Sequence, residues 1–145
     1  MQNPLFEDSY ARLFGSGIHS GNSDYFFERF YQHFLSVPEV ASLFANTDMK
    51  QQVAMLKRSL FHLTTFYVTS VPSAQLQQMA QVHRALDVQP DMFDDWLNAL
   101  VETVIELDVA ADESTKLAWC WALSPGITYM RLALHASDPW PNETS

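Results

Sequence analysis

Apolar residues recur at helical spacing along almost the whole 145-residue chain, and we find no convincing strand. Glycine, proline and clusters of polar residues separate the apolar segments. The pattern predicts helices at residues 9–16, 25–36, 38–44, 49–68, 73–87, 90–107 and 113–136. The expected fold class is therefore all-α, with about seven helices in one domain. Its core covers residues 9–136, and residues 137–145 form a loose tail.

Cap and breaker residues mark most of the expected helix ends. They are Gly15 and Gly17, Ser23 or Asp24, Pro38, Ser73 and Pro90.

Pro125 conflicts with the pattern of the last helix, because it removes one backbone hydrogen bond. It should kink the helix near Leu123 or Ser124. The alternative is two helices, with Ser124 capping the second. We favour one kinked helix, since the apolar pattern continues beyond the proline.

Composition excludes several classes of function. The net charge is -9 with only eight basic residues, which disfavours nucleic acid and anionic membranes as partners. No apolar run is long enough to span a membrane, and residues 1–8 do not resemble a signal peptide. Cys120 is the only cysteine, so a disulfide framework and a cysteine-based zinc site are excluded. We expect a cytoplasmic location.

His83 is the main candidate for chemistry. On a helix it shares one stripe with Leu76, Met79, Ala80 and Leu86, so its imidazole points toward the core. Such a histidine is either hydrogen-bonded inside the protein or a ligand to a buried group.

The rest of the chain favours the second interpretation, in which His83 is a ligand to a buried group. Gly-rich phosphate loops, paired metal-binding histidines and the Cys-x-x-Cys-His signature of covalent haem are all absent. What remains is one helix-borne histidine, a long helix about thirty residues earlier, and ten phenylalanines. A noncovalent haem needs these features, with one imidazole on its iron and flat apolar walls.

The other histidines and the tryptophans are given structural roles. His33 and His62 are interpreted as structural or surface residues. His62 lies on a different helical face from Gln52 and Leu56, so we do not expect it to be a second axial ligand. The tryptophans expected to pack between the last two helices are Trp96, Trp119 and Trp121.

Four stretches, spanning about residues 24–134, carry a family resemblance. They are Phe30-Tyr31-Gln32-His33-Phe34-Leu35 with Pro38, Glu39 and Phe44; Gln52 with Leu56 and Leu60; His83-Arg84-Ala85-Leu86-Asp87-Val88-Gln89-Pro90; and Ala118-Trp119 with Met130. In this order the chain resembles the bacterial single-domain globins, the globin part of flavohaemoglobins and the sensor-type globins. The resemblance implies a globin fold around noncovalent haem b.

The resemblance also implies roles for single residues. His83 would be the proximal iron ligand, and Tyr31 and Gln52 the distal polar groups, with Gln51 a possible misalignment by one residue. The residues that would contact the haem as walls are Phe44, Leu56 and Val88.

Physical chemistry supports the distal assignment independently. A tyrosine hydroxyl or glutamine amide can donate a hydrogen bond to a bound diatomic ligand in a dry pocket. A net gain of about 1–3 kcal/mol would slow oxygen escape roughly tenfold to a hundredfold. Taken alone, however, Tyr31 and Phe44 could be ordinary core residues and Gln52 a solvated one.

One departure from the flavohaemoglobin pattern affects function. Phe93 stands where those proteins carry a proximal tyrosine, and residues 128–133 contain no matching glutamate. A carboxylate-linked network raises the basicity of a histidine ligand, so its absence argues against strong peroxidase character.

The expected function is reversible binding of O2, and also of NO and CO, for oxygen binding or delivery. One alternative is an NO dioxygenase served by a separate reductase, and another is a gas sensor that signals to a separate partner. A haem-free helical interaction domain is the remaining alternative. The protein is expected to be a monomer or a homodimer, in which the last two helices would pair across a two-fold axis.

Overall fold

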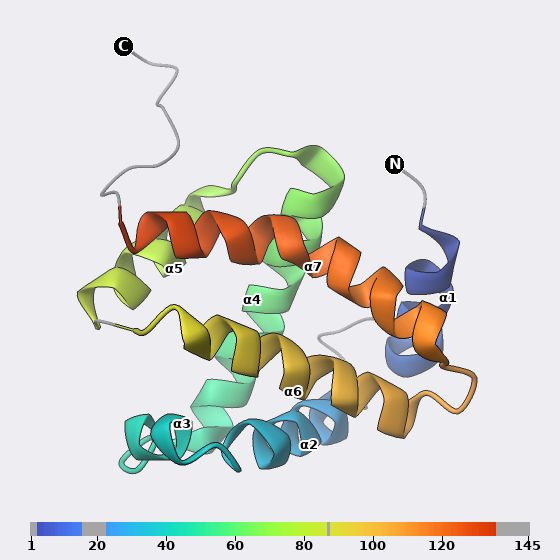
Figure 1. The fold of residues 1–145 in the computed structure, drawn as a ribbon, viewed down its shortest axis with the longest axis horizontal. Helices are drawn as coiled ribbons and strands as arrows, with labels where there is room; N and C mark the ends of the chain where they lie inside the picture. Colours follow the sequence, from blue (N-terminus) through green and yellow to red (C-terminus); the bar gives the residue numbers. More distant parts are fainter. Residues whose placement is uncertain (1–2, 16–22, 87, 136–145) are drawn as a thin grey trace.

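The computed structural model describes residues 3–15, 23–86 and 88–135, and in these ranges it contains helices and their connections but no strand (Figure 1). The helices are α1 (Pro4–Phe14), α2 (Asp24–Phe34), α3 (Pro38–Leu43), α4 (Met49–Thr69), α5 (Ala74–Ala85), α6 (Asp91–Leu107) and α7 (Glu113–Ala133). The predicted all-α class with about seven helices is confirmed. None of the described helices is long and apolar enough to cross a membrane.

The first helix starts five residues earlier than the pattern predicted, at Pro4 instead of residue 9. The Asn3 side chain accepts a hydrogen bond from the Phe6 amide, and proline suits the first helical position. Gly15 ends the helix, as predicted, with a positive φ of 47° that favours glycine. Gly17 and the predicted tail at 137–145 lie outside the described residues.

α7 continues through Pro125 as one helix, so the two-helix alternative is wrong. Its course bends near the middle (Figure 1). Proline has no amide hydrogen, so Pro125 donates none to the Trp121 carbonyl four residues earlier. The Ser124 hydroxyl separately donates to the Cys120 carbonyl in the same turn.

The core lies between α4 and α7, between α6 and α7, and between α2 and α6. Gly126 of α7 faces Leu63 of α4, and a Cβ at position 126 would collide with the end of the Leu63 side chain. The glycine therefore allows the two helices to approach closely. The largest fully buried side chains around this crossing and the α2–α6 contact are Trp119, Phe27, Phe30, Leu60, Leu76, Leu100 and Leu123.

The aromatic contacts of the tryptophans reach helices other than α6 and α7. Trp96 packs on the ring of Phe30 in α2, with 5.8 Å between the centroids. Trp119 packs on Phe6 of α1 at 4.7 Å, and Trp121 packs on a tyrosine of α4 at 5.9 Å. Through these contacts the three indoles join α6 and α7 to α2, α1 and α4.

A buried carboxylate fastens α1 to the junction between α6 and α7. Asp108 accepts hydrogen bonds from the Ser9 hydroxyl at 2.6 Å and from the Arg12 guanidinium at 2.7 and 2.9 Å. The Trp119 indole donates in turn to the Ser9 hydroxyl at 2.9 Å. Burial raises the pKa of the Asp108 carboxyl, but the hydrogen bonds from Arg12 and Ser9 outweigh it and hold that pKa below its usual range.

Replacing Asp108 with Asn should lower the free energy of unfolding by about 2–3 kcal/mol, because Arg12 and Ser9 lose a charged acceptor in a buried site. Asp94→Asn is the matched control, since its ion pair with Arg131 is exposed and should be worth less than about 1 kcal/mol. Urea denaturation measures both. An equal effect of the two substitutions would contradict the stabilising role of the buried Asp108 carboxylate.

The buried Asp108 carboxylate predicts that the free energy of unfolding depends on pH. Because the Asp108 pKa is lower in the folded than in the unfolded chain, its contribution is complete above about pH 4 and is lost as the pH falls through the folded value. The stability difference between the wild type and Asp108→Asn should therefore shrink at acid pH.

Candidate functional site

The position of His83 is set by the start of its helix. Ser73 caps α5 by accepting a hydrogen bond from the Leu76 amide at 3.0 Å. The same hydroxyl lies 3.0 Å from Nδ1 of His62 in α4. The cap of α5 is thus tied to the long helix, as the structural interpretation of His62 predicted, and α5 then carries His83 in its last turn.

The imidazole of His83 has a defined orientation. Its Nδ1 lies 2.7 Å from the Met79 carbonyl oxygen, one turn earlier. A carbonyl can only accept, so Nδ1 carries the proton, and in the neutral ring Nε2 keeps its lone pair. Metal-bound histidines characteristically donate their other ring nitrogen in this way. Leu86, predicted on the same inward stripe, is 68% exposed because α5 ends at Ala85.

Tyr31 lies in α2 with its ring buried against Phe30 and Phe44, at centroid distances of 5.0 and 6.0 Å. Its hydroxyl is 3.5 Å from the backbone oxygen of Gln52. Burial raises the pKa of the phenol to about 12, and the Gln52 side chain opposes this with a smaller effect. Tyr31 therefore remains a neutral hydrogen-bond donor at physiological pH.

The structure distinguishes the two neighbouring glutamines of α4. Gln52 is half-buried beside the Tyr31 hydroxyl, whereas Gln51 is exposed. Leu56, one turn further along the helix, is 4% exposed and belongs to the core.

Phe44 lies beside Tyr31, whereas Val88 and Phe93 lie beside His83. Phe44 ends α3 and is half-buried. Val88 is half-buried, and its amide donates to the His83 carbonyl at 3.3 Å. Phe93 is buried, with its ring centroid 6.1 Å from that of His83.

These residues form two groups at one end of the molecule. Tyr31, Gln52 and Phe44 are joined by contacts among α2, α3 and α4, and a second group around His83 joins α5 to α6. α3, α5 and the start of α6 lie together at the end opposite α1 (Figure 1).

Comparison with known proteins identifies the arrangement. A solved structure from Pseudomonas aeruginosa PAO1, of a protein described as structurally highly homologous to a human hemoglobin, is 31% identical to this chain. The match covers 90% of this chain and 95% of the other, with a TM-score of 0.75. This chain belongs to the bacterial globins. The resemblance seen in the sequence is thereby confirmed, although no family model and no curated protein matched the chain.

The globin fold suggests haem binding, and the residues present fit such a group. A bare Nε2 on His83 is a suitable axial ligand for iron. Between the end of α3 and the start of α6, several apolar side chains pack against the core but are incompletely buried, as the walls of an apolar macrocycle should be. They are Phe44, Met49, Val53, Met79, Val88 and Met92.

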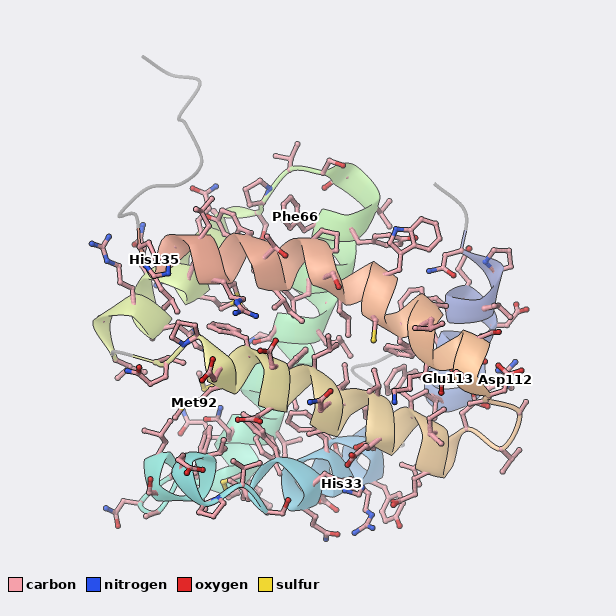
Figure 2. The ribbon with its side chains drawn as sticks, viewed as in Figure 1. His33, Phe66, Met92, Asp112, Glu113 and His135 are labelled. Atoms are coloured by element: carbon pink, nitrogen blue, oxygen red, sulfur yellow. The ribbon has the colours of Figure 1, made fainter. Side chains whose placement is uncertain are left out.

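Several of these globin residues were missed by sequence analysis. Met92 lies in the first turn of α6 (Figure 2), and Met49 and Val53 lie in the first two turns of α4. The helical pattern predicted their helices but did not distinguish half-buried from buried positions. The partner of His83 was detectable, because residue i−4 of a helix always offers its carbonyl on the same side.

The other described histidines lie in different surroundings. His33 lies 3.2 Å from Glu106 across the α2–α6 contact, in agreement with its expected structural role. His135 is exposed, and His19 lies outside the described residues.

The hydrogen bond to Met79 predicts the tautomer of His83 in the globin without haem. At slightly alkaline pH the neutral ring should carry its proton on Nδ1, because the carbonyl stabilises that form. Long-range proton–nitrogen correlation spectra distinguish the two tautomers, and a His83→Gln variant assigns the signal. A proton on Nε2 would contradict the orientation described above.

Proposed function

We propose that this globin binds haem b noncovalently through Nε2 of His83 and reversibly binds O2, and also NO and CO, on the side of Tyr31 and Gln52. The observation that carries the proposal is the 2.7 Å contact between Nδ1 of His83 and the Met79 carbonyl. It leaves the other ring nitrogen free to coordinate a metal. When bound, haem supplies the iron at which a diatomic gas binds.

The surroundings of His83 favour ligand binding over oxidative chemistry. Its hydrogen-bond partner is a neutral carbonyl, which raises the electron density of the imidazole less than a carboxylate would. The neighbouring Phe93 ring has no hydrogen-bonding group. Both features support oxygen binding as the primary role rather than peroxidase activity.

Tyr31 and Gln52 supply the polar side of the proposed site. The Tyr31 phenol, with a pKa of about 12, keeps its proton at physiological pH and can donate it to a hydrogen bond. The Gln52 amide offers a second donor near the same place. Because the phenol is buried, a hydrogen bond from it counts for more than it would in water.

Replacing His83 with Ala should abolish stable haem binding, because the axial ligand is lost. His33→Ala is the control, since His33 is also a half-buried helical histidine but lies beside Glu106 at the α2–α6 contact. Titration of each apoprotein with haem, followed by the Soret band, measures the affinity. Haem binding by His83→Ala at wild-type strength would mean that another residue is the ligand.

Replacing Tyr31 with Phe should speed oxygen dissociation roughly tenfold to a hundredfold, because the variant loses a hydrogen bond worth about 1–3 kcal/mol. Tyr25→Phe on the same helix is the control, because Tyr25 is 62% exposed. Stopped-flow displacement of O2 by CO measures both rates. An unchanged rate in Tyr31→Phe would remove Tyr31 as the principal donor.

A further inference from the structure

An open hollow lies between α1 and the C-terminal end of α4, and we call it the α1–α4 hollow. α1 contributes Phe6, Glu7 and Tyr10 to its lining, and α4 contributes three threonines and Val68. Its volume is about 350 Å³, within the range of about 300–1,000 Å³ that is usual for small-molecule sites. α1 lies at the end of the molecule opposite α3 and α5 (Figure 1), so this hollow is separate from the proposed haem site.

The wall formed by α1 is aromatic. The rings of Phe6 and Tyr10 lie 5.8 Å apart, and both pack on Trp119 of α7, at centroid distances of 4.7 and 6.3 Å. These contacts hold the two rings in place without a ligand. Burial raises the pKa of the Tyr10 phenol, so it stays neutral. Aromatic rings attract cations as well as apolar groups.

The threonines of α4 offer hydrogen-bond acceptors. The hydroxyls of Thr64 and Thr65 both donate to the Phe61 carbonyl, at 3.0 and 2.8 Å. The Thr69 hydroxyl donates to the Val71 carbonyl at 3.2 Å. A hydroxyl has only one proton, so what remains for a ligand is lone pairs. These side chains therefore suit a ligand that donates hydrogen bonds.

The electrostatic character of the hollow is negative. Among the described residues that line it, Glu7 is charged and none is Lys, Arg or His. The Asn3 amide donates to Oε2 of Glu7 at 3.1 Å, which holds the carboxylate and leaves Oε1 able to accept from a ligand. The hollow also reaches the last turn of α4, where the helix dipole is negative. Glu7 offsets the opposite polarity at the start of α1.

We propose that the α1–α4 hollow binds a small organic ammonium ion. Its apolar body lies against Phe6, Tyr10 and Val68, and its N–H groups donate to Glu7 and to the threonine hydroxyls. Such an ion supplies both the positive charge and the donors that match this lining. A carboxylate of the same shape would instead meet Glu7 and the carbonyl end of α4, and the net charge of -9 would repel it.

The first test compares two probes of the same shape. Phenethylammonium joins a phenyl ring to a primary ammonium group, and 3-phenylpropionate carries a carboxylate in its place. The full chain, labelled with nitrogen-15 and kept reduced under CO so that no amine binds haem iron, is titrated with each probe. Proton–nitrogen correlation spectra should show saturable shifts at the amides of Phe6, Thr65 and Val68 with phenethylammonium. The expected Kd is about 1–10 mM, and 3-phenylpropionate should not bind.

The second test removes the charge of the hollow. Glu7→Gln should weaken the binding of phenethylammonium about three- to fivefold, because the amide keeps an acceptor for Asn3 but loses the ion pair. Asp8→Asn is the matched control. It removes the same charge from the next residue of α1, which is exposed and does not line the hollow, so binding should not change.

The third test fills the hollow with a cation of the protein itself. Val68→Lys places an ammonium group at the lining, and it should compete with the probe and weaken its binding. Val68 is 68% exposed, so the substitution does not disturb the core. Val71→Lys adds the same charge at an exposed position outside the lining, and it should weaken binding less.

Three results would overturn the proposal. They are the lack of saturable shifts at the three amides, binding of 3-phenylpropionate as tight as that of phenethylammonium, and an equal effect of Glu7→Gln and Asp8→Asn. The spectra themselves show whether each variant is folded.

Discussion

The close crossing of α4 and α7 at Gly126 is the constraint on which the rest of this globin depends. Without a side chain at that position, α7 lies directly against Leu63 of α4. This contact fixes the long helix that carries Gln52 and Leu56 at one end. Near its other end the same helix carries His62, whose hydrogen bond to Ser73 holds the cap of α5. Both sides of the proposed haem site are thus positioned by the same helix, α4.

Much of the fold could be predicted from the sequence because its helices have strong apolar periods and clear stops. Pro38, Ser73 and Pro90 marked boundaries that the structure reproduces closely. The start of α1 was missed because its capping residue, Asn3, precedes the first apolar periodic segment. Pairings between distant segments were also not predictable. The aromatic partners of the tryptophans in α1, α2 and α4 were not predicted, because periodicity gives the buried face of a helix, not the helix that covers it.

The residues of the candidate site could be predicted from the sequence, but the orientation of their side chains could not. Position in the sequence suggested Tyr31, Gln52 and His83, whereas the choice between Gln51 and Gln52 depends on the phase of α4 beside Tyr31. The chemistry that follows depends on hydrogen-bond partners. A neutral carbonyl behind His83 and a protonated phenol beside Gln52 suit a site that holds a polar diatomic ligand without strongly activating it.

The central claim is that Nε2 of His83 binds the haem iron while Nδ1 donates to the Met79 carbonyl. The most direct measurement is the optical spectrum of a His83→Gly apoprotein that is mixed with haem and titrated with free imidazole. We expect the spectrum of unbound haem without imidazole. The wild-type spectrum should return, with saturation, as imidazole fills the space and donates to the same carbonyl. A variant that shows the wild-type spectrum without imidazole would contradict the central claim.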